Sequence, residues 1–226
     1  MILERENWEE LRLMKDNNKR IERTKKLVEY DRQIAKGCKF FCGIDEAGRG
    51  PLAGPVVVAS CVMPLDDDKI LYGIDDSKKL SERQREELFE KIKQTAIDYS
   101  IQEVDEKTID EINILNATKL GMKNAIENLN ADIDLALVDA VKDIDSNVDQ
   151  IAIIKGDATS YSIAAASILA KVYRDNLMTN FDKEYPQYNF AKHKGYGTSE
   201  HIKLLKQFGP CKIHRKTFIK NFVEIK

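Results

Sequence analysis

The sequence has few of the residues that build disulfide scaffolds, nucleotide-binding P-loops and membrane spans. Only four of its 226 residues are cysteine, and no two form a Cys-x-x-Cys pair, which excludes a disulfide scaffold. We expect reduced, mostly buried thiols. No Gly-x-x-x-x-Gly-Lys-Ser/Thr loop is present, which argues against an NTP-driven enzyme. No apolar run is long enough to span a membrane, and the charged start Met1–Glu6 is not a secretory signal, so we expect a cytoplasmic protein with no membrane partner.

The small formal net charge of −2 conceals a segregation of charge along the chain. Residues 98–157 contain fourteen acidic and five basic side chains, a net of −9, whereas residues 187–226 contain nine basic and two acidic side chains, a net of +7. This pattern fits an acidic metal centre beside a basic surface that holds an anionic substrate. A solvated charged face is the alternative interpretation.

The most informative stretch is Ile44–Pro55, which reads IDEAGRGPLAGP and lies between two apolar runs. Asp45 and Glu46 are expected where a buried strand ends, and ionised carboxylates there are costly unless they are paired or bind a cation. The glycines of this stretch let a ligand approach main-chain N–H groups, and the planar guanidinium of Arg49 suits a phosphate. A hairpin with a solvated acidic pair is the alternative.

The apolar pattern predicts an α/β sheet with helices packed on it. Expected strands cover 40–44, 55–62, 99–104, 135–138 and 151–154. Three of them are followed by acids, because Asp139 and Asp157 repeat the arrangement seen at Asp45. The alanine-rich segment after Asp157 predicts a helix with a slim face that stops before Pro186.

Two capping boxes mark further helix starts. Ser81-Glu82-Arg83-Gln84 and Thr108-Ile109-Asp110-Glu111 both have the spacing at which a side chain caps the N-terminus. Residues 1–36 contain no Gly or Pro and carry one sparse apolar stripe, which predicts a helix that ends at Gly37. This helix is either docked or mobile without a catalytic role, or it is an arm that handles the substrate.

The acids at the strand ends predict a site for a hard cation. Carboxylates without clustered His or Cys favour Mg²⁺ or Mn²⁺ over zinc, and the mutual repulsion of four such acids is relieved by divalent ions. Two ions about 4 Å apart can activate a water and stabilise the leaving oxygen of a phosphodiester. A non-enzymatic, cation-stabilised nucleic-acid-binding module is the alternative, although structural Ca²⁺ sites commonly take their ligands from one loop.

The stretch from Asp45 to Pro55 resembles the signature of ribonuclease HII, the type 2 ribonuclease H family. Further blocks resemble the family in family order, over roughly residues 39–218: Asp76-Ser77-Lys78-Lys79-Leu80-Ser81, Asn113-Ile114-Leu115-Asn116-Ala117-Thr118, Val138-Asp139, Lys155-Gly156-Asp157, Ala164–Val172 and His193-Lys194-Gly195-Tyr196. One position departs from the pattern, because Ala140 stands where the family usually has Gly. We expect this to alter local backbone freedom but not the ligand.

The resemblance implies a ribonuclease H-like mixed sheet flanked by helices, with a small C-terminal helical part. Residues 1–38 would be an N-terminal helical extension and residues 39–226 the catalytic domain with its basic C-terminal segment. The implied protein is a monomer that hydrolyses the RNA strand of RNA/DNA hybrids and nicks 5′ of single ribonucleotides in duplex DNA, leaving 5′-phosphate and 3′-OH ends. Two Mn²⁺ or Mg²⁺ ions would be held by Asp45, Glu46, Asp139 and Asp157.

The resemblance also implies how the substrate is recognised. Main-chain groups of Gly48, Arg49 and Gly50 and the hydroxyl of Tyr196 would read the 2′-OH, the group that distinguishes ribose from deoxyribose. Lys78 and Lys171 would contact phosphates. Without the resemblance, Tyr196 reads as a packed aromatic and the Lys78-Lys79 pair as either surface lysines or an anion site at a helix start.

A ribonuclease that uses the 2′-OH as nucleophile typically needs histidine as general acid and base. The three histidines, His193, His201 and His214, are distant in sequence from the acids. We expect them to be surface or substrate-contacting residues.

Overall fold

The computed structural model describes residues 2–224, with side-chain environments from residue 18 onward. Five strands form one mixed sheet in the order β3-β2-β1-β4-β5. β2 pairs antiparallel with β1 and β3, whereas β4 pairs parallel with β1 and β5. The bounds match the expected strands within two residues except at the end of β1: β1 Phe41–Ala47, β2 Val56–Val62, β3 Asp98–Val104, β4 Leu135–Asp139 and β5 Asp149–Ile153.

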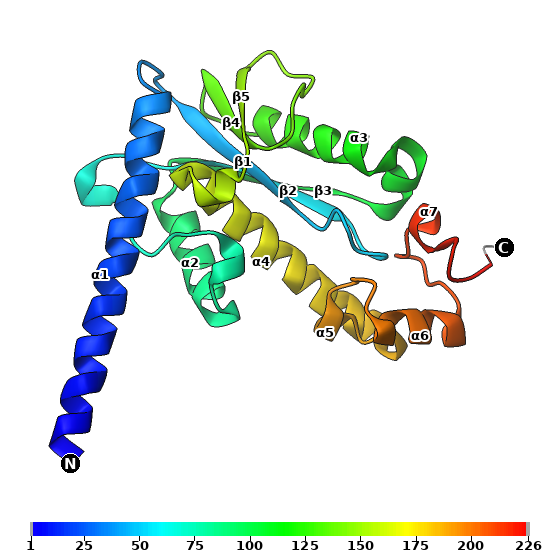
Figure 1. Cartoon of the computed structure of the whole chain (residues 1–226). Coiled ribbons are helices and arrows are strands. Elements are labelled where there is room, and N and C mark those ends of the chain that lie inside the picture. Colours follow the sequence, from blue (N-terminus) through cyan, green and yellow to red (C-terminus); the bar gives the residue numbers. More distant parts are fainter. Residues whose placement is uncertain (1, 225–226) are drawn as a thin grey trace.

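Helices cover both faces of the sheet (Figure 1). α3 lies on one face, and α4 crosses the other, with α2 and α1 beside it (Figure 1). A group of short helices at the far end of α4 forms the small C-terminal part that was expected. The bounds are α1 Ile2–Ile34, α2 Glu82–Thr95, α3 Glu106–Glu127, α4 Tyr161–Glu184, α5 Phe190–His193, α6 Ser199–Phe208 and α7 Lys216–Ile219.

The alternation of side chains along β2 explains why both faces are covered. Val57 and Cys61 belong to the apolar cluster shared with α1, α2 and α4, whereas Val58 and Val62 belong to the cluster shared with α3. Successive residues of a strand point to opposite faces, so a strand that is apolar at every position needs a cover on each side. No helix within residues 2–224 is long and apolar enough to cross a membrane.

α4 lies unusually close to the central strand because β1 contains a glycine. A Cβ built on Gly43 would approach the main-chain carbon of Ser162, in the first turn of α4, to 2.1 Å. Any larger residue would push α4 away from the sheet. This contact sets the depth at which α4 crosses the strand that carries Asp45 and Glu46.

One of the two predicted capping boxes is confirmed and the other is wrong. Ser81 and Gln84 cap α2 reciprocally. α3 begins at Glu106, where the Asp105 side chain accepts a bond from the N–H of Thr108, so Thr108 lies inside the first turn. Asp105 places a carboxylate at the positive end of the helix, and it outcompetes the hydroxyl three residues later as the N-cap.

The C-terminal half of α1 is docked on the core, and its N-terminal half projects away from it (Figure 1). Leu27 and Val28 are 1% and 3% exposed and pack in the cluster shared with α2 and α4. The buried carboxylate of Asp31 accepts a bond of 2.8 Å from the N–H of Ser162, at the start of α4. The predicted helix is therefore confirmed. The division into an extension at 1–38 and a catalytic domain at 39–226 stays a prediction.

The expectation of surface or substrate-contacting histidines is wrong. His193, His201 and His214 are 7%, 0% and 2% exposed and form an internal cluster. The rings of His193 and His201 stack with centroids 4.4 Å apart, and Nε2 of His201 lies 3.0 Å from Nε2 of His214. The imidazoles pack among the apolar residues of the C-terminal part, where Phe190 lies against the rings of His201 and His214. The cysteines are all free as expected, with Cys42 and Cys61 fully buried.

Candidate active site

Parallel pairing of β1 with β4 brings two of the predicted acids together. Ile44 is in register with Val138, so Asp45 and Asp139 follow paired residues on neighbouring strands. Glu46 is the next residue on β1, and its side chain is 12% exposed. Parallel strands end at the same edge of a sheet, which is why acids far apart in sequence meet there.

Burial and like charge raise the pKa values of these three carboxyl groups. For Asp45 burial is the largest cause, and the Glu46 and Asp139 carboxylates raise its pKa further, to well above the ordinary value. Burial raises the pKa of Glu46, and the positive charge of Arg49 partly opposes this effect. Burial also raises the pKa of Asp139, although the hydrogen bond from the N–H of Gly156 lowers it in part. Each group is therefore short of positive charge.

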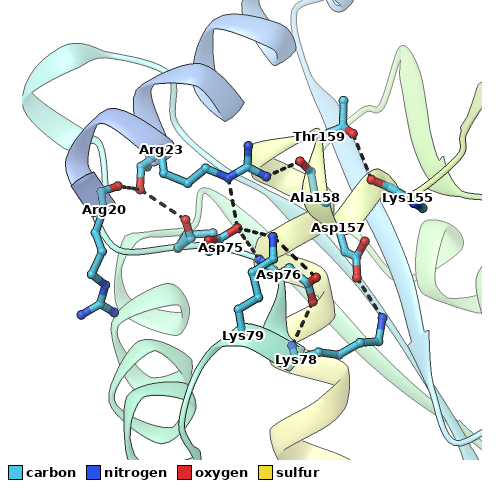
Figure 2. A network of polar contacts seen from close by, with 12 residues as sticks. Arg20, Arg23, Asp75, Asp76, Lys78, Lys79, Lys155, Asp157, Ala158 and Thr159 are labelled. Carbon is cyan, nitrogen blue, oxygen red and sulfur yellow. Dashed lines mark hydrogen bonds and ion pairs between the residues drawn. The ribbon is translucent and has the colours of Figure 1, made fainter. Parts of the chain in front are cut away.

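The fourth predicted acid lies in the turn after β5. Asp157 is in a short 3₁₀ segment, Gly156–Ala158, and is 4% exposed. The preceding residue ties this turn to the strand ends, because the N–H of Gly156 donates to Oδ1 of Asp139 at 2.7 Å. Nζ of Lys78 lies 3.0 Å from Oδ2 of Asp157 (Figure 2). Lys78 is thus beside the acids, and its contact with a phosphate stays a prediction.

Arg23 of α1 contacts the same turn. Its guanidinium donates to the carbonyl of Ala158 and, at 3.2 Å, to Oδ1 of Asp75, just before the segment that carries Lys78 (Figure 2). The N-terminal helix thus touches both loops that flank Asp157. No pattern around Arg23 in the sequence indicated this contact.

We call Asp45, Glu46, Asp139 and Asp157 the acid cluster, and its chemistry fits a hard cation. Oε2 of Glu46 is buried and has no hydrogen-bond partner among the residues that the structure describes, and all four side chains offer carboxylate oxygens. In the described residues the carboxylates do not converge as a metal-binding group of three or more. Asp157 is turned to Lys78 and Glu46 to Arg49, whose Nη1 is 3.3 Å from Oε1. A cation would compete with these lysine and arginine contacts.

The loop that follows Glu46 lies close to Tyr196, and both are predicted to read the substrate. We call residues 48–55 the glycine-rich loop. Two features of position 48 require glycine: its φ is +96°, and a Cβ there would lie 2.0 Å from Nε of Arg174. A Cβ on Gly50 would be 3.9 Å from Cε1 of Tyr196, so this loop and Tyr196 border the same space. Tyr196 is 44% exposed, which leaves its ring accessible.

Two arginines that sequence reasoning missed hold this loop. Arg215 and Arg174 are 0% and 1% exposed, and their guanidinium groups donate to carbonyls of the loop. Their partners are more than a hundred residues away in sequence, so no local pattern announced them. Lys171, the other predicted phosphate contact, pairs with Asp175 at 2.7 Å on α4, and its role stays a prediction.

Ala140, which stands where the family usually has Gly, adopts a backbone conformation that favours glycine. Its φ is +55°, in the left-handed region, directly after Asp139. An alanine there carries a strain of about 1 kcal/mol, and the turn is kept because the Ala140 N–H donates to the carbonyl of Ile153 at 3.0 Å.

Comparisons with known proteins agree on the family. The family model of ribonuclease HII matches residues 42–221. The ribonuclease HII of Ruminiclostridium cellulolyticum is 54% identical over 214 residues, which are 94% of this chain and 83% of that protein, so the match reaches into α1.

Solved structures agree as well. The ribonuclease H2 of Pyrococcus horikoshii has a TM-score of 0.67 and 30% identity, covering 79% of this chain and 93% of its own. The ribonuclease HII of Archaeoglobus fulgidus, solved in complex with PCNA, has a TM-score of 0.67 and 26% identity, covering 82% and 98%. The chain belongs to the ribonuclease HII family, metal-dependent endoribonucleases that act on RNA/DNA hybrids.

Proposed function

We propose that this endoribonuclease nicks DNA duplexes 5′ of a single embedded ribonucleotide, in addition to hydrolysing the RNA strand of hybrids. The observation that carries the proposal is the closeness of Gly50 to Tyr196, in a loop whose Arg49 contacts Glu46 of the acid cluster at 3.3 Å. A binding site formed by a few residues can recognise one 2′-OH, and such a site does not need a long RNA tract. Membership of an enzyme family removes the alternative of a non-enzymatic binding module.

In this proposal the acid cluster holds two Mn²⁺ or Mg²⁺ ions. Bound divalent ions supply an activated water and stabilise the leaving oxygen, which gives 5′-phosphate and 3′-OH products. The support is the orphaned Oε2 of Glu46 and the raised pKa values of Asp45, Glu46 and Asp139, since uncompensated buried carboxylates favour a cation.

The remaining roles belong to side chains around the acids. Gly48, Arg49 and Gly50 read the 2′-OH, and Tyr196 reads it and packs at the junction with the following deoxynucleotide. Lys78 and Lys171 contact phosphates, and Lys78 is within 3.0 Å of Asp157, where it also offsets negative charge. The protein acts as a monomer, and none of these roles requires a protein partner.

The test compares two substrates and two variants. Wild type should cleave a DNA duplex with one ribonucleotide when Mg²⁺ or Mn²⁺ is added. Tyr196→Phe should lower cleavage of that duplex about fivefold, a hydrogen bond's worth, and Tyr196→Ala should lower it further through lost packing. An RNA strand paired with DNA is the second substrate. A wild type that needs several ribonucleotides in a row, or products ending in a 2′,3′-cyclic phosphate, would refute the proposal.

A further inference from the structure

The glycine-rich loop is held from behind by two buried positive charges. Arg215 donates to three loop carbonyls, those of Gly48 at 2.6 Å, Arg49 at 2.9 Å and Gly54 at 2.8 Å. Arg174 donates to Ala53 at 3.1 Å and Pro55 at 3.0 Å, and also to Lys194 at 3.0 Å.

Neither guanidinium has an ion pair with a carboxylate in the part of the chain that the structure describes. Asp110, the acid that most favours charged Arg215, instead accepts the main-chain N–H groups of Lys216 and Thr217. Asp175, near Arg174, pairs with Lys171. Six carbonyl oxygens thus replace carboxylates around two buried cations. Burying unpaired charge is costly, so an arrangement that only had to support a loop would not need it.

The direction of these bonds determines what the loop shows to solvent. In a trans peptide the C=O of one residue and the N–H of the next point in opposite directions, and no peptide bond of the described chain is cis. The carbonyls of Gly48 and Arg49 point inward to Arg215, so the N–H groups of Arg49 and Gly50 point away from it. Both residues are exposed, and within residues 2–224 neither N–H has a protein acceptor.

Arg174 connects the same arrangement to Tyr196. Its guanidinium carbon lies 5.9 Å from the centre of the Tyr196 ring, and its bond to the Lys194 carbonyl fixes the turn that leads to Tyr196. The main chain joins the two parts as well, because the N–H of Leu52 donates to the Gly195 carbonyl at 2.8 Å.

We propose that Arg215, assisted by Arg174, is a positioning residue that determines ribose specificity. It turns two loop carbonyls inward, which presents the N–H groups of Arg49 and Gly50 as paired donors to the ribonucleotide, and it places uncompensated positive charge behind them. The inference rests on the proposed function, because it identifies the residue that orients the loop proposed to bind the 2′-OH. Arg215 acts through the loop and does not touch the substrate.

The test measures discrimination in binding and not only activity. Two DNA duplexes are used, identical except for one ribonucleotide, and binding is followed by fluorescence anisotropy in Ca²⁺, with intact strands verified on a gel. Wild type should bind the ribonucleotide duplex more tightly. Arg215→Lys keeps the charge but has one nitrogen for three carbonyls, so the preference should fall at least fivefold while affinity for all-DNA duplex changes less than twofold.

A matched control separates positioning from general damage. Tyr188→Phe removes a hydroxyl that donates to Gly209 at 2.6 Å in the same C-terminal part and leaves the loop untouched, so the preference should stay at the wild-type value. A parallel loss of both affinities in folded Arg215→Lys, or an unchanged preference, would overturn the inference and leave the proposed function standing. A wild type without preference would overturn both.

A measurement on wild type covers the case in which Arg215→Lys does not fold. Amide hydrogen exchange followed by NMR should show the N–H groups of Arg49 and Gly50 exchanging rapidly in the free protein. The ribonucleotide duplex should slow both at least fivefold, and the all-DNA duplex should not. Equal protection by the two duplexes, or by neither, would rule out paired donors.

Discussion

The acid cluster and the glycine-rich loop both contain buried charge, and they stabilise it in different ways. The acids are crowded at the ends of paired strands, with raised pKa values and an unpartnered oxygen on Glu46. Each of the three guanidinium nitrogens of both arginines behind the loop donates to a carbonyl of the chain itself. The acids therefore lack partners within the described chain and suit a bound cation, whereas the arginines find their hydrogen-bond acceptors within the folded chain.

The largest effect should come from removing one acid. Asp45→Asn should lower cleavage by at least three orders of magnitude, because a two-ion site loses a ligand, while the unfolding temperature in chelator stays equal or rises as like-charge repulsion is relieved. Cleavage assays and thermal unfolding check both parts. Asp149→Asn, at an exposed position of β5, is the control and should change neither. Near-wild-type cleavage by Asp45→Asn would remove Asp45 from the ligand set.

The second effect concerns pH, because the histidine cluster is buried in the neutral form. Burial lowers the pKa of His201 and of His214 to about 4. As pH falls below about 6.5, the unfolded chain takes up these protons first, so stability is lost between about pH 6.5 and 4 at about 1.4 kcal/mol per pH unit for each histidine. The raised carboxyls of the acid cluster act in the opposite direction.

A variant isolates the histidine contribution. Urea unfolding at pH 7, 6 and 5 should show a shallower loss of stability in His201→Asn than in wild type, since Asn does not titrate. The comparison cancels the carboxyl groups, which are the same in both proteins. Equal slopes would mean that the cluster takes up protons in the folded state.

A third, smaller effect tests whether α1 supports the acid cluster. Arg23→Gln removes the bridge from α1 to Ala158 and Asp75, and should lower cleavage about tenfold while raising the Mg²⁺ concentration needed for half-maximal rate. Metal titrations of the rate measure this. Lys26→Gln makes the same charge change at an exposed position of α1 and should behave as wild type. A fall in rate without a change in metal requirement would show that Arg23 does not act on Asp157.

The smallest effect is at Ala140. Ala140→Gly should stabilise the protein by about 0.5 kcal/mol, because the relief of strain at the observed φ of +55° is partly offset by the entropy of glycine in the unfolded chain. Denaturant unfolding measures it. Stability equal to or below that of wild type would mean that the entropy of the added glycine in the unfolded chain outweighs the strain.

The acids and the sheet could be predicted from sequence because their signals are local. An apolar run that ends in Asp marks both a strand and its end, and parallel pairing then brings Asp45 and Asp139 together. The start of α3 was missed because two acceptors, Asp105 and Thr108, compete three residues apart. Arg174 and Arg215 could not be found, because nothing near them in sequence shows that their partners are carbonyls more than a hundred residues away.

The histidines were misplaced for a related reason. A polar residue in a basic segment suggests the surface, and only the fold shows that His201 and His214 bond to one another in the interior. A polar side chain can be buried when it has a hydrogen-bond partner. The partner of His201 is His214, and the burial of His214 could not be predicted from sequence either.

The bonds from Arg215 span 161 to 167 residues of sequence, and this has a consequence for synthesis of the chain. The last strand of the sheet ends at Ile153, so the strands that carry Asp45 and Asp139 can pair on the ribosome long before Arg215 has been made. Until then the glycine-rich loop lacks the group that orients its peptide planes. A nascent or clipped chain would hold its acids on paired strands with an unformed loop, and under the proposed role of Arg215 its selectivity for ribose would be the last property to form.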